Sequence, residues 1–135
     1  MEPASIYGSD PGPLGSVLVI DDDENVRGVF VEGLEAYGYR VHEASNGPAA
    51  LRILEEGMAI DVVVVDFAMP VMNGATLAQA ARRLRPGLPI VFASGYADTG
   101  AFEAVPGATI LRKPFQVAEL AEVIRRTFLT GIETV

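Results

Sequence analysis

Apolar and polar residues follow one another along this chain in two different rhythms. Short runs of consecutive apolar residues recur from Val17 onward, and such runs are typical of strands buried on both faces of a sheet. Between them lie longer segments in which apolar residues return every three or four positions, the period of an amphipathic helix. The runs predict five strands: Val17–Ile20, Tyr39–Ala44, Asp61–Asp66, Pro89–Ser94 and Ala108–Lys113. The periodic segments predict four helices, Glu24–Tyr37, Pro48–Glu56, Ala75–Leu84 and Gln116–Leu129, and a weaker helical segment, Asp98–Ala104.

Strands that alternate with helices imply one parallel sheet with helices on both of its faces. Because crossovers between parallel strands are right-handed, the predicted fold is a doubly wound α/β domain. In such domains ligands bind beyond the carboxyl ends of the strands, near the point where the strand order reverses. Functional side chains are therefore expected where the strands end.

Two glycines help to place the ends of the predicted helices. Gly38 directly follows the first helix, where a left-handed backbone conformation is expected. Asn73 and Gly74 predict the turn into the third helix, and Gly74 is expected there because it tolerates a positive φ.

Composition bounds the size and class of the domain. The chain has 135 residues, half of them hydrophobic, which suits a single domain with a substantial core. The first 16 residues contain three prolines and three glycines without apolar periodicity, and they predict a disordered tail or linker before a domain at 17–135. Within this tail the sequence GPLGS, Gly12–Ser16, resembles the remnant of a cleavable expression tag, so part of it need not be native.

Charge and hydropathy exclude several classes of function. The formal net charge of −8 argues against direct nucleic acid binding, since phosphate neutralisation requires a basic surface. No apolar run is long enough to span a bilayer, and the first residues lack the features of a signal peptide. The absence of cysteine also suits a reducing compartment. We therefore expect a cytoplasmic location without membrane insertion.

Polar residues of complementary chemistry end the predicted strands. The acids Asp21–Asp23 follow the first strand, Asp66 ends the third, Ser94 ends the fourth and Lys113 ends the fifth. Each has an ordinary structural explanation by itself, such as helix capping by an aspartate. Because all four strand ends lie at the same edge of the sheet, one shared site explains these residues better than four separate structural roles.

The chemistry of these residues favours a phosphoryl group and a hard cation. Neighbouring carboxylates repel one another unless a cation intervenes, and a donor set made only of oxygen favours Mg²⁺, with Mn²⁺ as the alternative. Lysine adds a fixed positive charge and serine a hydrogen-bond donor. The G-x-x-x-x-G-K-[ST] motif of nucleotide-binding P-loops is absent from the sequence, and an acidic turn would repel a flavin phosphate. The single histidine, His42, lies within a predicted strand and is expected to be structural.

Four segments resemble the signature blocks of the bacterial response-regulator receiver domain: VLVIDDDENVR, VVVVDFAMPVMNG, FASGYAD and LRKPF. They occur in the family's order between Val17 and about Leu129, and RPGLPIVFASGYAD resembles receivers attached to hybrid histidine kinases in particular. The resemblance implies a flavodoxin-like sheet of strand order 2-1-3-4-5 with five helices. It also implies a phosphoprotein that acts as a phospho-accepting switch in a two-component phosphorelay.

The resemblance further implies a role for each acid at the site. Asp66 would accept a phosphoryl group from the phosphohistidine of a histidine kinase or a histidine phosphotransfer domain. Mg²⁺ would be held by Asp22, Asp66 and the main-chain carbonyl of Ala68. Asp21 would hold it directly or through water. For the third acid, Asp23, helix capping is a better prediction than metal ligation.

By the same resemblance, Lys113 and Ser94 would contact the phosphoryl group once Asp66 is phosphorylated. Lys113 would pair with the acyl phosphate, Ser94 would move inward to hydrogen-bond it, and a cis peptide would precede Pro114. The surface of the segment 98–104, the last strand and the last helix would then change, and a weak or phosphorylation-dependent homodimer is a further implied partner. Many receivers carry an aromatic residue where this chain has Ile110, so Ser94 is expected to signal through other movements, such as those of the 96–100 loop.

Two other functions stay open from the residues alone. A metal-dependent phosphatase with an aspartyl nucleophile would usually carry a second aspartate at the position of Ala68, which disfavours that alternative. A degenerate receiver used only for docking is disfavoured because every expected site residue is present. We therefore expect a receiver that assists its own phosphorylation and dephosphorylation and is not an enzyme in the usual sense.

Overall fold

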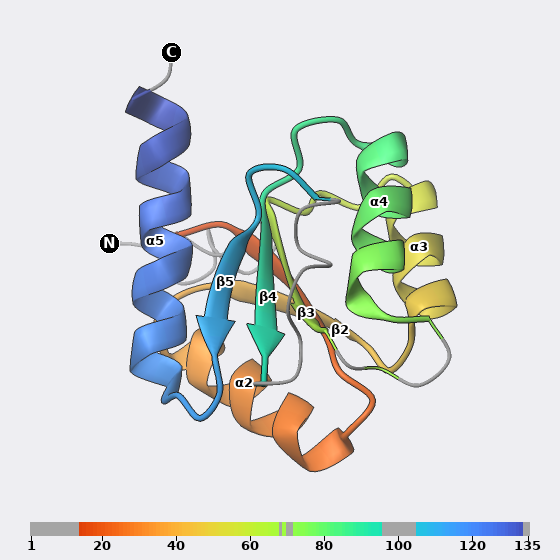
Figure 1. Cartoon of the computed structure of the whole chain (residues 1–135). Helices are drawn as coiled ribbons and strands as arrows, with labels where there is room; N and C mark the ends of the chain where they lie inside the picture. The colour runs from red at the N-terminus through yellow and green to blue at the C-terminus, as the bar shows by residue number, and fades with distance from the viewer. Residues whose placement is uncertain (1–13, 68, 70–71, 96–104, 134–135) are drawn as a thin grey trace, which may run out of the picture.

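The computed structural model describes residues 14–67, 69, 72–95 and 105–133, with the side chains described as far as residue 128 (Figure 1). Its sheet has five parallel strands in the order β2-β1-β3-β4-β5, which confirms the predicted architecture. The strands are β1 (Ser16–Ile20), β2 (Arg40–Ala44), β3 (Val62–Asp66), β4 (Ile90–Ser94) and β5 (Thr109–Arg112). The helices within the described ranges are α2 (Glu24–Ala36), α3 (Gly47–Glu55), α4 (Gly74–Leu84) and α5 (Val117–Glu133). The predicted tail up to residue 13 and the predicted helical segment Asp98–Ala104 lie outside these ranges.

Helices cover both faces of the sheet, α2 and α5 on one side and α3 and α4 on the other (Figure 1). Alternate residues of the central strand serve the two resulting cores, because successive side chains of a strand point to opposite faces. Val62 and Val64 pack with α2 and α5, whereas Val63 and Val65 pack with α3 and α4. The unbroken valine run is therefore the signature of a strand without a solvent face. None of the described helices is long and apolar enough to cross a membrane.

The observed element ends agree with the predicted ends to within a few residues, and the differences have local causes. β1 begins at Ser16, one residue early, because Ser16 pairs with Arg40 of β2 and its carbonyl accepts from the Asp61 amide at 2.9 Å. The ladder of β5 ends at Arg112, and Pro114 beyond it lacks an N–H with which to continue the pairing. α5 runs on to Glu133 instead of ending near residue 129, since no proline interrupts its hydrogen bonding there.

Helix capping follows the sequence closely. The side chain of Asp23 accepts hydrogen bonds from the amides of Asn25 and Val26 at the start of α2, which confirms its predicted capping role. Asn73 caps α4 in the same way by accepting from the Thr76 amide at 2.9 Å. Gly38 after α2 has a φ of 107°, as predicted for a residue that ends a helix.

Candidate functional site

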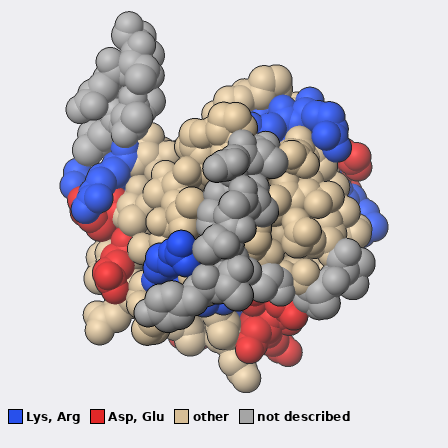
Figure 2. Space-filling view, in the orientation of Figure 1, with Lys and Arg blue, Asp and Glu red and all other residues tan. Residues whose placement is uncertain are grey.

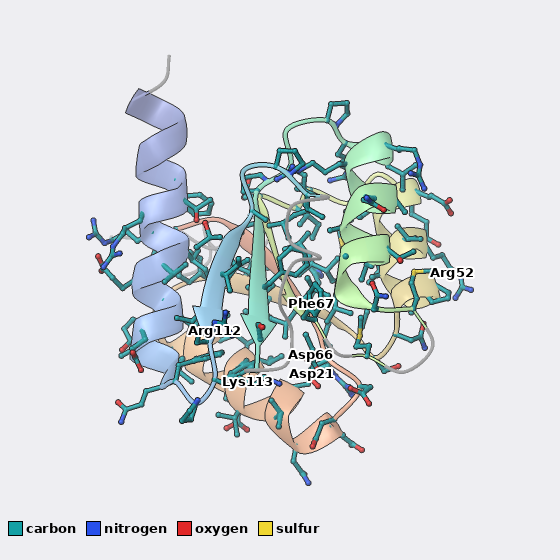
Figure 3. The ribbon with its side chains drawn as sticks, in the orientation of Figure 1. Asp21, Arg52, Asp66, Phe67, Arg112 and Lys113 are labelled. Carbon is teal, nitrogen blue, oxygen red and sulfur yellow. The ribbon has the colours of Figure 1, made fainter. Side chains whose placement is uncertain are left out.

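Three carboxylates meet at the carboxyl ends of the strands. Asp21 directly follows β1 and Asp66 is the last residue of β3, so the parallel pairing of these strands brings the two side chains together (Figure 3). Asp22 joins them, and one carboxylate oxygen from each of the three residues lies within 4.8 Å of the others. The acids that were separated by more than 40 positions in the sequence therefore form one cluster, as predicted.

Burial makes this cluster unfavourable by itself. Asp21 is only 2% exposed, while Asp22 is open to solvent. Burial raises the pKa of Asp21, and the charges of Asp66 and Asp22 act in the same direction. The Asp23 amide and the Lys113 ammonium oppose this rise without cancelling it. The site is therefore short of positive charge, which is the condition that favours a bound cation.

The main chain of Asp21 is held by a residue that sequence reasoning missed. Arg27, one turn into α2, donates from Nη1 to the Asp21 carbonyl at 2.7 Å and from Nε to Glu43 Oε1 at 2.8 Å. The Asp21 side chain itself accepts from the Asp23 amide at 2.9 Å. Arg27 thus ties α2 and β2 to the turn that carries the acids. In the sequence, the one feature that could have pointed to this role is that Arg27 follows the capping residue Asp23 by four positions, about one helical turn.

Lys113 supplies the positive charge nearest to the predicted acceptor. Its Nζ lies 3.3 Å from Asp66 Oδ1, with the lysine side chain 39% exposed and the aspartate side chain 11% exposed. The ammonium can therefore approach both Asp66 and a group bound beside it (Figure 3). The Lys113 amide donates to the Ser94 carbonyl at 2.8 Å, and the peptide bond to Pro114 is cis, as predicted.

Ser94 ends β4 at the same edge and is fully buried. Its hydroxyl donates to the Gly95 carbonyl at 3.0 Å. The same carbonyl accepts from Arg112 Nη1 at 2.9 Å, so the serine shares its acceptor with a cation of the neighbouring strand. Ser94 and Arg112 are register partners in β4 and β5, which explains how both reach Gly95.

Gly74 packs directly behind the end of β3. A Cβ atom at Gly74 would lie 2.8 Å from the Phe67 Cα, closer than packing allows, and 3.2 Å from the Asp66 carbonyl oxygen, which is a tight contact. The Gly74 amide also donates to the Phe67 carbonyl at 2.9 Å. Gly74 is not among the residues with positive φ, so the predicted reason for this glycine was wrong. The glycine is required because α4 begins in contact with the strand end that carries Asp66.

Ala68, whose carbonyl was the fourth predicted metal ligand, lies outside the described residues. Ile110, at the position that is often aromatic, is 39% exposed and lies in register with Phe92.

The donor set that the structure brings together fits a hard divalent cation. It consists of carboxylate oxygens from Asp21, Asp22 and Asp66, the donor type that Mg²⁺ and Mn²⁺ share. One exposed acid beside two buried ones leaves a solvent path to the cluster. Mg²⁺ usually retains several waters, which suits an incompletely enclosed group of this kind.

The raised pKa of Asp21 predicts a pH dependence of stability in metal-free buffer. Folded Asp21 binds a proton more tightly than unfolded Asp21, so the free energy of unfolding should fall as pH rises from about 3.8 through the raised pKa. Asp21→Asn should remove that part of the dependence and make the neutral-pH protein more stable than the parent, because the buried carboxylate no longer has to ionise. Urea unfolding with a chelator between pH 4 and 7 measures both effects. A difference between variant and parent that does not change with pH would contradict the assignment.

The fold and the site together define a receiver domain of two-component signalling. The family model described as the response regulator receiver domain matches residues 17–125, and the chain belongs to this family.

Relatives of different architecture carry similar segments. The chain is 39% identical over 114 residues to the sensor kinase CckA of Brucella abortus, covering 82% of this chain but only 12% of the kinase. It is 32% identical over 118 residues to the response regulator receiver protein CpdR of the same species, covering 85% of this chain and 98% of CpdR. The crystal structure of the receiver domain from the hybrid histidine kinase CckA superposes with a TM-score of 0.71 at 36% identity, covering 84% of this chain and 98% of that domain.

Proposed function

We propose that this receiver is a phospho-accepting switch in which Asp66 carries the phosphoryl group. The observation that supports this most directly is that the Asp66 carboxylate belongs to the acid cluster and lies 3.3 Å from the Lys113 ammonium. Asp66 ends a strand that is buried on both faces, so its backbone is well fixed, and in-line attack depends on such fixity. The donor is proposed to be a phosphohistidine of a kinase or phosphotransfer domain.

The transfer is a displacement at phosphorus. An Asp66 carboxylate oxygen attacks the phosphorus of the phosphohistidine, the new O–P bond forms as the N–P bond breaks, and the imidazole nitrogen keeps the electron pair. Lys113 neutralises charge that spreads over the phosphoryl oxygens. Mg²⁺ bound by Asp21, Asp22 and Asp66 would add a second positive charge at the same place. Ser94 would then hydrogen-bond the acyl phosphate.

The surroundings of the domain are proposed from its relatives. One relative is a sensor kinase in which the similar segment is a small part, and another is a receiver protein that the similar segment covers almost completely. We propose that the domain predicted at 17–135, whose first strand begins at Ser16, acts as the receiver within the cytoplasm and that the residues before this strand serve as a tail or linker. Either a hybrid kinase or a separate kinase would then supply the phosphoryl group.

The function is tested with acetyl phosphate as a small donor. Intact-mass measurement should find one added phosphoryl group in the presence of Mg²⁺, and the adduct should be lost in alkali, as expected of an acyl phosphate. Chelation of divalent ions should prevent the addition. Many turnovers of phosphate release without an accumulated adduct would instead favour the aspartyl phosphatase.

The metal assignment is tested at Asp22. Asp22→Ala should weaken Mg²⁺ binding about tenfold or more, because it removes the exposed ligand of the cluster and leaves two buried ones. Calorimetric titration with Mg²⁺ measures the affinity directly, and Asp23→Asn is the matched control because asparagine still caps α2. Unchanged affinity in Asp22→Ala would show that the cation binds elsewhere.

A further inference from the structure

The carbonyl of Gly95 accepts two hydrogen bonds of different kinds. One comes from the Ser94 hydroxyl at 3.0 Å and the other from Arg112 Nη1 at 2.9 Å. A carbonyl oxygen has two lone pairs, so both donors can bind at once. The residue that is proposed to sense the phosphoryl group is therefore joined, through one oxygen, to a cation on the edge strand of the sheet.

Movement of Ser94 toward the phosphoryl group changes this arrangement. A phosphoryl oxygen is charged and forms a stronger hydrogen bond with a hydroxyl than a neutral carbonyl does. The hydroxyl must nevertheless give up the Gly95 carbonyl, and Gly95 is half-buried, so the loss of a donor there opposes the movement. Arg112 lowers this opposition because its bond to the same oxygen does not depend on Ser94.

We infer that Arg112 is a positioning residue for the Ser94 switch. Arg112 keeps its hydrogen bond to the Gly95 carbonyl while the Ser94 hydroxyl moves to the phosphoryl group; this role rests on the proposed function. The register of β4 and β5 makes the arrangement specific, since Ser94 and Arg112 are direct partners. Arg112 thus links the proposed phosphorylation site to β5, the strand in which Ile110 stands where many receivers have an aromatic residue.

The positive charge of Arg112 could also favour a bound phosphoryl group directly, without the Gly95 carbonyl, and the experiment must separate the two effects. Figure 2 shows basic side chains beside the carboxyl end of β5 and acidic side chains over the first turn of α2, and Figure 3 places Arg112 next to Lys113. A cation near the site attracts an anionic group whether or not it acts through Gly95. The two effects differ in one respect, because only the effect through Gly95 requires the Ser94 hydroxyl.

A double-mutant cycle separates them, with beryllofluoride as the phosphoryl analogue and saturating Mg²⁺. Fluorine NMR titration measures the affinity of the parent, Arg112→Ala, Ser94→Ala and the double variant. We expect Arg112→Ala to weaken binding about fivefold, the size of one hydrogen bond. In the Ser94→Ala background the same change should weaken binding less than about twofold. Mg²⁺ affinity and the thermal midpoint of Arg112→Ala should stay at the parent's values, which a merely structural role would not allow.

Arg83→Ala is the matched control, because it removes the same charge from the last turn of α4, at the opposite end of the sheet (Figure 1). It should leave beryllofluoride affinity unchanged. An equal loss from Arg112→Ala with and without the Ser94 hydroxyl, or no loss in either background, would overturn the inference and leave the proposed function standing. Failure of the parent protein to bind beryllofluoride would overturn the proposed function and this inference with it.

Discussion

Asp66→Asn is expected to abolish phosphoryl labelling by acetyl phosphate and by a phosphorylated kinase. Asparagine has nearly the same shape as aspartate, but its amide lacks the negative oxygen that attacks phosphorus. No other carboxylate combines the end of a buried strand with a lysine at 3.3 Å among the residues that the structure describes. Intact-mass measurement after incubation with Mg²⁺ and the donor reports the result directly.

The fold should survive this replacement. The variant loses one of three mutually repelling charges, which favours the metal-free protein. Lys113 loses its partner, but its side chain is 39% exposed and remains solvated. We expect a thermal midpoint within a few degrees of the parent, and Asp23→Asn should keep both the midpoint and full labelling. Labelling of Asp66→Asn at the parent's rate would mean that another carboxylate is the acceptor.

Gly74→Ala is expected to have the largest effect on stability. Its Cβ would lie 2.8 Å from a main-chain atom of Phe67, and the backbone of a strand end cannot yield as a flexible side chain can. Overpacking of this kind costs about 1–3 kcal/mol, and the better helix propensity of alanine recovers about 0.5–1 kcal/mol. We expect a net loss of about 1 kcal/mol, which lowers the thermal midpoint by about 3–6 °C.

Gly28→Ala provides a control of identical chemistry. Gly28 lies within α2, and a Cβ there would meet no atom within 4 Å. Alanine should therefore stabilise the protein by about 0.5–1 kcal/mol through helix propensity alone. Gly74→Ala should also slow labelling of Asp66, because the added Cβ would lie 3.2 Å from the Asp66 carbonyl oxygen. If both glycine replacements raised stability alike, the close approach behind β3 would be refuted.

Much of the fold could be predicted from local pattern. The valine run before Asp66 indicated a strand buried on both faces, and the alternation of its residues between two cores confirms it. Asp23 and Gly38 marked the ends of α2 because capping and left-handed backbone depend on residue type and close neighbours. Such features involve residues only a few positions apart, so they can be recognised in the sequence.

The acids of the site could be predicted for a related reason. In a parallel sheet the carboxyl ends of the strands share one edge, so Asp21, Asp66 and Lys113 were expected together once the strands were placed. The structure brings them together, with Lys113 Nζ 3.3 Å from Asp66 Oδ1. Their roles stay predictions that rest on chemistry and on the family.

Contacts that depend on packing were decided by the tertiary structure alone. The sequence suggested a turn at Gly74, but the reason for that glycine is the distance between α4 and β3. Nothing in the sequence joined Arg27 to the Asp21 carbonyl, or Arg112 to the carbonyl beside Ser94. These bonds depend on strand register and on the direction of long side chains, which apolar periodicity does not specify. The sequence by itself therefore determined which chemistry gathers at the sheet edge, while the packing of helices and strands decided which residues hold it in position.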